Sequence, residues 1–473
     1  MTLYYKTVRF FFLFLLSFFS LYAEEGNSLP LVSADVNTSL LHYDMNTSAY
    51  NDWNDSIYTW NTSGTGGSYP PLISADLNAS AYDWNALNTK WVNMRAATIL
   101  ALDKSHFFQD DRSLYQVGDM SHYDRVDVRG IRLGAIGTIN FDKAWTYAVM
   151  LSFNSFRRDF NSTIEDRLTL YDAVVGIPVW GEYGRMQIGK MKAPISMERI
   201  MGLVFEQTME RPTHLDALLD SRSIGIDFSD MVFDQRFTWK IGAFNNWLDK
   251  DDLSFSEANK ELVARVTAVA YEDEEKGRLL HLGAGYRYVD IREGTIRYAV
   301  GPEQWFVDPW VDTGDFTAEA SHTVNLEMSY LDGPLWLASE YTSTSVDAAQ
   351  FGNPVFSGYH VAANYFLTGE HRGYNKRRGV VRRITPILDF SNGGWGAIEL
   401  SARYSALDLT DRAIKGGTIA IGSLGGIWHP RRDMQFHMQW SRTHLNSTEV
   451  TTSIIPVKSD SDILQFRMVI VID

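Results

Sequence analysis

From about residue 91 to the end of the chain, apolar and polar side chains alternate along successive short segments. Within 398–404, for example, Ile398, Leu400 and Tyr404 share one face, while Glu399 and Arg403 take the other. A period of two residues indicates β-strands whose two faces meet different environments. The clearest further cases are 145–153, 434–440 and 464–472.

The environment of the apolar face favours a membrane over the core of a soluble β-sandwich. The outward residues are large, and many at the segment ends are aromatic, as the interface girdles of a membrane barrel require. The opposite face carries Arg, Glu, Gln and His, which a sandwich core does not accept unpaired. The pattern also continues to the end of the chain, where a barrel closes its last strand on its first. The sequence therefore predicts an all-β, transmembrane antiparallel β-barrel.

Seventeen segments qualify as candidate strands. Because single-chain bacterial barrels use even strand numbers, we expect sixteen strands, with one of the seventeen segments spurious or outside the wall. The alternative is a barrel of eighteen strands. Short turns at 332–334 and 391–394 fit one rim, and the long polar stretches 193–221, 246–260 and 291–320 fit loops at the other. The candidate strands are 92–102, 126–139, 144–155, 167–177, 184–192, 222–229, 235–245, 261–271, 279–290, 321–331, 334–345, 357–367, 380–390, 395–407, 416–428, 433–445 and 462–472.

Amino-acid composition further restricts the class of protein to which the chain can belong. Aromatic residues make up 13% of the chain although the mean hydropathy is only −0.20, which suits strands with one lipid-facing and one water-facing side. Beyond the N-terminus there is no apolar run of about 18 residues, as a membrane helix would need. The chain has no Cys and a net charge of −15, which argue against thiolate sites and against a nucleic-acid partner.

The first 23 residues have the features of a secretory signal peptide. Lys6 and Arg9 precede an apolar run over 10–19, and Ala23 is a suitable residue before a cleavage site. Removal of this segment takes the net charge from −15 to −17, because Lys6 and Arg9 are its only charged residues.

Residues 24–90 form a second region, rich in Asn, Ser, Thr and Asp. Residues 30–39 recur in closely similar form at 71–80, with a Gly-rich joint between them. Two copies are too few for a repeat fold, so we interpret 24–90 as a polar arm that precedes a barrel at 91–473.

Residues 187–198 carry a distinctive pattern of Gly189, Lys192, Pro194, Ser196 and Glu198. Together with other motifs in order along 91–473, this pattern resembles the phosphate-selective porin O and P family, in which a similar strand enters a loop folded into the barrel. That resemblance implies sixteen strands, an inward constriction loop, a homotrimer, and diffusion of small anions, phosphate among them. The other similar segments are 129–134, 209–212, 222–226, 369–375 and 393–409.

An anion pathway needs cationic side chains that face the lumen. By strand alternation, Arg132, Lys240 and Arg403 point inward, as do Arg287 and Arg467. The expected constriction loop adds Lys192, Arg199 and Arg211, with Arg222 just beyond it. The predicted ion-pathway residues are thus Lys192, Arg199, Arg211, Arg222, Arg132, Lys240 and Arg403.

The alternative for each of these residues is a structural ion pair. Glu327, Glu340 and Glu399 also point inward by alternation, and the acids of the loop are Glu198, Glu206 and Glu210. A basic run at 376–378, with Arg382 and Arg383, fits three interpretations: an anion-collecting mouth, a site for lipopolysaccharide phosphates, or the periplasmic rim.

The leading hypothesis is an outer-membrane porin for passive diffusion of small anions, with outer-membrane lipid and lipopolysaccharide as its surroundings. One alternative is a general or cation-preferring porin, suggested by the acidic chain. Another is a surface anchor or adhesin whose barrel displays the arm. We predict no enzymatic activity, catalytic residue, cofactor or metal site, because no nucleophile elbow, phosphate-binding Gly-Lys loop or paired-His zinc motif is present.

Overall fold

The computed structural model describes residues 86–153, 168–249, 254–447 and 457–472. The predicted signal peptide and almost all of the predicted polar arm lie outside the described residues. Among the residues that are described, no helix is long and apolar enough to cross a membrane.

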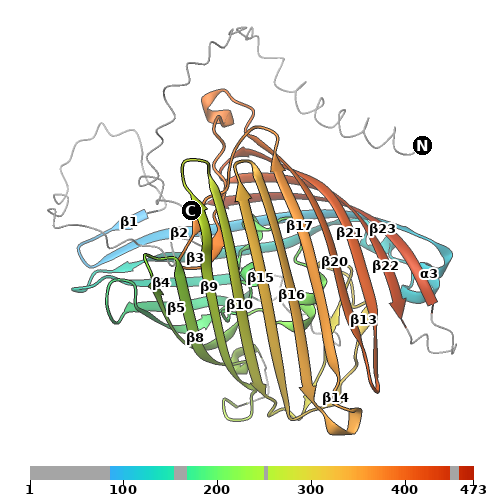
Figure 1. Ribbon diagram of the computed structural model, residues 1–473. Coiled ribbons are helices and arrows are strands. Elements are labelled where there is room, and N and C mark those ends of the chain that lie inside the picture. The colour runs from blue at the N-terminus through green and yellow to red at the C-terminus, as the bar shows by residue number, and fades with distance from the viewer. Residues whose placement is uncertain (1–85, 154–167, 250–253, 448–456, 473) are drawn as a thin grey trace, which may run out of the picture. The chain divides into compact units, whose positions relative to one another are not determined.

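Sixteen long antiparallel strands form one closed sheet (Figure 1). Each strand pairs with the next along the chain, and β23 returns to pair with β2 from Thr98↔Ile472 to Gln109↔Ser461. The strands are β2 (Val92–Gln109), β3 (Val126–Ile139), β4 (Trp145–Phe153), β5 (Leu168–Pro178), β6 (Arg185–Met191), β7 (Ser223–Val232), β8 (Phe237–Asn245), β9 (Lys260–Asp273), β10 (Arg278–Asp290), β15 (Ala320–Asp332), β16 (Leu335–Asp347), β17 (Val355–Phe366), β20 (Ala397–Asp411), β21 (Ile414–Arg431), β22 (Met434–Ser447) and β23 (Val457–Ile472).

The remaining elements are short. A three-residue strand, β1 (Ala86–Asn88), pairs with the start of β2, so sheet pairing begins slightly before the predicted boundary at residue 91. The small strands are β11 (Thr295–Ile296), β12 (Ala299–Val300), β13 (Val311–Asp312), β14 (Phe316–Thr317), β18 (Tyr374–Asn375) and β19 (Val380–Val381). The helices are α3 (Asp111–Val117), α4 (Met197–Ile200) and α5 (Thr213–Leu218), and the 3₁₀ turns are η1 (Ser121–Tyr123), η2 (Leu203–Phe205), η3 (Trp247–Asp249), η4 (Ala349–Phe351) and η5 (Phe390–Asn392).

The predicted closed barrel of sixteen strands is confirmed, and sixteen of the seventeen candidate segments overlap its strands. The segment that does not enter the wall is 380–390, which contributes only the two-residue β19 to a connection between β17 and β20. Pro386 lies in the middle of this segment, and a proline has no N–H to donate to a neighbouring strand.

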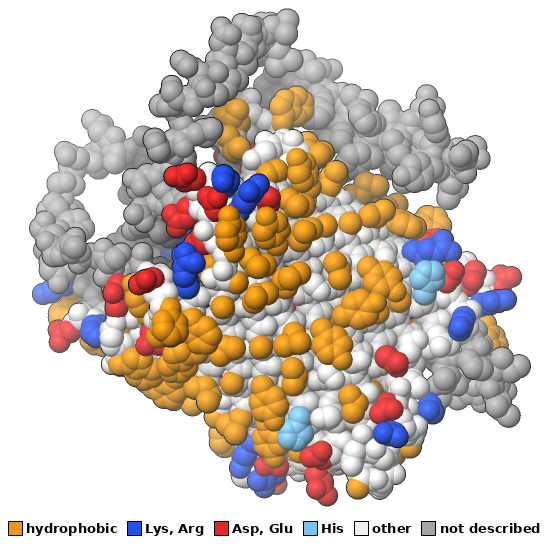
Figure 2. Space-filling model, in the orientation of Figure 1, with side chains coloured by type: hydrophobic (Ala, Val, Ile, Leu, Met, Phe, Trp, Pro, Cys, Tyr) orange, Lys and Arg blue, Asp and Glu red, His pale blue; other side chains and the backbone are white. Residues whose placement is uncertain are grey.

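The two faces of each strand differ as predicted. In β20, Leu400 and Tyr404 are 47% and 46% exposed on the outside, whereas Glu399 and Arg403 on the other face are 0% and 4% exposed. Figure 2 shows apolar side chains spread over the outer surface of the strands in view, with charged side chains gathered towards the borders. The outer face is therefore apolar and the lumen is polar.

Short and long connections between strands lie at opposite rims of the barrel. Between β15 and β16 only Gly333 and Pro334 intervene, and Gly333 has a φ of 54°, a left-handed conformation that glycine adopts without strain. The long connections 192–222, 246–259 and 291–319 all leave from the other rim, as predicted. Because bacterial barrels have short periplasmic turns, the rim with Gly333 corresponds to the periplasmic side. One connection breaks this rule: 367–396, on the short-turn rim, contains the predicted turn at 391–394 inside a much longer segment.

A charge on the outer face tests the membrane-spanning arrangement. Leu326, at the middle of β15, is 50% exposed, and Val355, the first residue of β17, is 47% exposed. Arg at a bilayer midplane costs roughly 2–4 kcal/mol, and about 0–1 kcal/mol near the interface. We expect Leu326→Arg to lower the free energy of unfolding by about 2–4 kcal/mol, and Val355→Arg by about 1 kcal/mol or less. Denaturant titration in lipid vesicles measures both, and equal losses would contradict a bilayer around the strands.

Candidate functional site

The connection 192–222 between β6 and β7, called the constriction loop below, lies inside the barrel. The Met197 backbone N–H donates to Glu327 of β15 at 2.6 Å, and the Met209 N–H donates to Gln439 of β22 at 3.0 Å. On a third side, Glu210 pairs with Arg129 of β3 at 2.5 Å. A single segment that contacts separate parts of a closed wall must cross the lumen, which confirms the predicted inward loop.

Paired charges hold this loop to the wall at Glu210. Glu210 accepts from both Arg129 and Arg467, and Arg467 also pairs with Asp103 at 2.7 Å. All four side chains are almost completely buried. Burial opposes ionisation of Glu210, yet the two guanidinium groups hold the pKa of its carboxyl well below the usual range. Removing one member of such a cluster would leave a buried charge without compensation, which is strongly destabilising.

The loop also ties itself together. Ser196 caps α4 by accepting from the Arg199 N–H at 2.9 Å. The Arg199 side chain pairs with Asp216 at 2.6 Å and donates to the Leu219 carbonyl, so it joins the two halves of the loop. Arg211 pairs with Glu206 at 2.8 Å. Nearby, burial raises the pKa of the Glu198 carboxyl to about 7.

A second inserted segment comes from 291–319, between β10 and β15. Its Glu303 pairs with Arg403 of β20 at 2.6 Å and accepts from the Thr213 N–H of the constriction loop at 3.2 Å. Trp305 lies under the guanidinium of Arg129, 3.8 Å from its carbon to the ring centre. The second segment therefore braces the constriction loop against the wall.

A third inserted segment enters from the opposite rim. Within 367–396, β18 and β19 form a small antiparallel hairpin over 374–381, called the inner hairpin below. Arg265 of β9 donates to the carbonyls of Arg378 and Gly379 at 2.6 and 2.8 Å. The Arg378 side chain continues to the constriction loop and donates to the Ile200 carbonyl at 2.9 Å. The constriction loop and the inner hairpin thus meet within the lumen.

A small cavity of about 30 Å³ lies where they meet. Four cationic side chains line it, against two carboxylates, Asp172 and Asp227. Because the cavity is small, a solute that enters it contacts these side chains directly. The four cationic residues are Lys192, Arg222, Lys240 and Arg378.

An aromatic stack extends this basic surface. Arg222 pairs with Asp172 at 2.8 Å and lies over the Tyr171 ring, 3.2 Å from its centre. Arg132 lies 4.6 Å from the same ring. Tyr171 therefore holds two guanidinium groups close together, through the attraction of a cation for an aromatic face.

The structure separates the seven predicted ion-pathway residues into two groups. Lys192, Arg222 and Lys240 line the cavity, and Arg132 joins them through Tyr171. Arg199, Arg211 and Arg403 are not among the residues that line the cavity, and they form the ion pairs described above. Arg222 is also paired, with Asp172, so the two groups differ in whether they lie at the cavity and not in whether they form an ion pair.

Sequence reasoning did not select Arg378. The sequence shows a basic run at 376–378, but it carries no sign that 374–381 folds inward. Nothing in the local pattern shows which rim hairpin turns into the lumen, because that depends on its contacts with Arg265 and Thr238 on distant strands.

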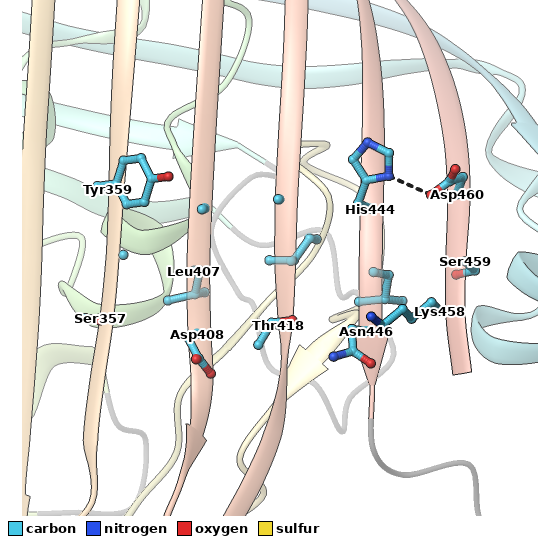
Figure 3. Close-up of a pocket in the computed structure, with 15 residues that line it drawn as sticks. Ser357, Tyr359, Leu407, Asp408, Thr418, His444, Asn446, Lys458, Ser459 and Asp460 are labelled. Atoms are coloured by element: carbon cyan, nitrogen blue, oxygen red, sulfur yellow. Dashed lines mark hydrogen bonds and ion pairs between the residues drawn. The ribbon is translucent and has the colours of Figure 1, made fainter. Parts of the chain in front are cut away.

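A larger hollow of about 460 Å³ lies elsewhere, across β17, β20, β21, β22 and β23 (Figure 3). Its lining includes Tyr359, His444 and Asp460, and His444 pairs with Asp460 at 2.6 Å. These side chains alternate with buried ones on their strands and lie on the outer face. The hollow is therefore away from the lumen and is no part of the inner passage.

The seating of the constriction loop depends on glycines in the wall. A Cβ at Gly285 of β10 would lie 2.0 Å from the Ile195 carbonyl oxygen, which is backbone and must move. We expect Gly285→Ala to lower the free energy of unfolding by about 1–3 kcal/mol, as overpacking does. Gly422→Ala, whose new Cβ meets nothing within 4 Å, is the matched control and should change little. Denaturant titration compares them, and equal stability would show that the loop does not rest on Gly285.

Comparison with known families adds a match over most of the chain. The family model described as phosphate-selective porin O and P matches residues 105–472. A curated relative, described as an uncharacterized protein of Caulobacter vibrioides, is 25% identical over 323 residues, which cover 66% of this chain and 62% of that protein. The match therefore spans less than two thirds of the relative's length.

Among solved structures, similar chains include in-vitro folded OmpT, an outer membrane protein of Vibrio cholerae, with a TM-score of 0.49, 12% identity, and coverage of 82% of this chain and 99% of that one. The outer membrane channel DcaP of Acinetobacter baumannii has a TM-score of 0.48 and 10% identity, with coverage of 82% of this chain and 99% of that one. An anion-selective porin from Comamonas acidovorans has a TM-score of 0.46 and 12% identity, with coverage of 80% of this chain and 99% of that one.

Proposed function

Because the chain belongs to the phosphate-selective porin O and P family, we propose that it is a porin of the bacterial outer membrane through which small anions, phosphate among them, diffuse passively. The observation that carries the proposal is the cavity between the constriction loop and the inner hairpin. Four cationic side chains surround it, and only two acids do. This excess of positive charge favours an anion at the narrow point of the lumen.

The chemistry of the lining suits an oxyanion. The planar guanidinium of Arg378 carries N–H donors of the kind that match the oxygens of a phosphate, whereas Nε and Nη2 of Arg222 already donate to Asp172. Lys192 and Lys240 offer more compact positive charges. Together they replace part of the hydration that an anion loses on entry. Asp172 and Asp227 offset part of that charge, which keeps binding weak enough for release.

A cation-preferring porin is less well supported. Three lumen acids that would attract cations are already paired with arginines: Glu210 with Arg129, Glu303 with Arg403, and Glu399 with Arg372 at 2.8 Å. Their charge is compensated within the wall and the inserted segments. The acidity of the whole chain therefore says little about the charge that a permeating ion meets.

The proposed partners follow from the same family and fold. We propose that three copies assemble as a homotrimer, with outer-membrane lipid and lipopolysaccharide around the apolar outer face. The predicted signal peptide would direct the chain to this membrane and then be removed. Purification in mild detergent followed by mass measurement tests the homotrimer.

Ion selectivity is the direct test. We expect the purified protein in a planar bilayer under a KCl gradient to show a reversal potential of the sign for chloride preference. Added phosphate should reduce the chloride current, because both anions compete for the same cavity. A potential of the sign for potassium would refute the anion proposal. A complete absence of conductance would favour the surface-anchor hypothesis.

The contribution of a single cavity residue can be isolated with Lys240→Gln. This change removes one of the four cations from a position on β8, outside the constriction loop, so we expect a lower permeability ratio of chloride to potassium. Lys104→Gln removes the same charge from an exposed position on the outer face of β2 and should leave the ratio unchanged. Equal effects of the two changes would mean that overall charge, rather than the cavity, sets selectivity.

A further inference from the structure

One buried carboxylate joins the two inserted segments that frame the cavity. Glu327 lies on the lumen face of β15 and is 4% exposed. One carboxylate oxygen accepts from the backbone N–H of Met197, in the constriction loop, at 2.6 Å. The other accepts from Arg265 of β9, through Nε at 2.9 Å and Nη2 at 2.5 Å.

Arg265 carries the connection on to the inner hairpin. Besides Glu327, it donates to the carbonyls of Arg378 and Gly379 at the tip of that hairpin. A Cβ at Gly379 would come within 3.1 Å of Arg265 itself, so the tip packs directly on the guanidinium. The planar, five-donor group of an arginine can hold a carboxylate and two carbonyls at once.

His281 of β10 makes a second link between the same partners. Its Nε2 lies 3.1 Å from Glu327, and its Nδ1 lies 2.5 Å from the hydroxyl of Tyr374 in β18. With Glu327 ionised, Nε2 donates to the carboxylate and Nδ1 accepts from the tyrosine. Gly283 leaves the necessary room, because a Cβ there would lie 2.2 Å from the Glu327 carboxylate.

We propose that Glu327 is a positioning residue for ion selection. It holds the constriction loop, from one rim, and the inner hairpin, from the other, at the separation that places Arg378 in the cavity beside Lys192. This inference rests on the proposed anion-selective function and adds to it the residue that sets the geometry of the narrow point. Glu327 is not among the residues that line the cavity, so its effect on an ion acts through Arg378.

A purely electrostatic role for Glu327 and a positioning role predict opposite changes in chloride preference for Glu327→Gln. The loss of a negative charge from the lumen wall would by itself raise the preference for chloride. If Glu327 positions Arg378, the change instead lets the hairpin and loop separate, and the chloride preference falls. The reversal potential of the full-length protein in a KCl gradient gives the sign.

Glu340→Gln is the matched control. Glu340 is the cross-strand neighbour of Glu327 and also accepts from the constriction loop, from the Glu198 N–H at 2.6 Å. None of its described contacts reaches the inner hairpin. We therefore expect this variant to keep or raise the chloride preference. A fall equal to that of Glu327→Gln would overturn the proposal, because the inner hairpin would then be irrelevant.

Arg265→Lys tests the same link without a change of charge. A lysine cannot hold Glu327 and both hairpin carbonyls in one plane, so we expect the chloride preference to fall here as well. If Glu327→Gln fails to assemble, Arg265→Lys still tests the link between the constriction loop and the inner hairpin. An unchanged chloride preference in Arg265→Lys would overturn the proposal.

The double variant Glu327→Gln with Arg378→Gln identifies the residue through which Glu327 acts. Two residues that act through one another are not additive in a double-mutant cycle. We expect Arg378→Gln alone to lower the chloride preference, and Glu327→Gln to add no further loss in that background. A full additional loss would overturn the proposal. A wild-type protein that prefers potassium would instead refute the proposed function itself, so the two failures are distinguishable.

Discussion

Every backbone N–H and C=O of a membrane-embedded strand must find a partner in the protein, because the hydrocarbon offers none. Closure of β23 onto β2 meets this requirement, since it removes the two edges that a flat sheet of sixteen strands would expose. The rest of the structure depends on this closure. It creates a lumen that is separated from lipid, and only in such a lumen can the chain hold so many charged side chains.

The lumen is organised by pairing of these charges. Arg467 and Arg129 hold the constriction loop at Glu210, Glu303, itself paired with Arg403, braces it at Thr213, and Arg265 with Glu327 fixes the inner hairpin. Buried ion pairs contribute little net stability, but their geometry is specific and the loss of one partner is costly. They therefore define where the inserted segments lie. At the cavity, cationic side chains outnumber acidic ones, and this excess of positive charge is what a permeating ion meets.

The sequence predicted the wall well, because a strand that separates lipid from water repeats its pattern every two residues over its whole length. Leu400 and Arg403 could be assigned to opposite faces without any knowledge of their neighbours. The inward course of 192–222 was predicted only through resemblance to a family. The misplaced segment 380–390 has apolar and β-branched residues like a strand, and its true position follows from contacts that no local pattern records.

The sequence by itself thus determined the closed barrel, the face of each strand and the pool of basic residues from which a passage could be built. Only the tertiary structure decided which of them are engaged elsewhere and which surround the cavity. Arg199, Arg211 and Arg403 look like Arg222 in sequence, but only Arg222 of these four lines the cavity. Their partners, such as Glu303 for Arg403, cannot be read from the local sequence. Alternation determines whether a side chain points inward, since it is a local property. Pairing across a lumen depends on which segments fold back into it, and that is settled only when the whole barrel has closed.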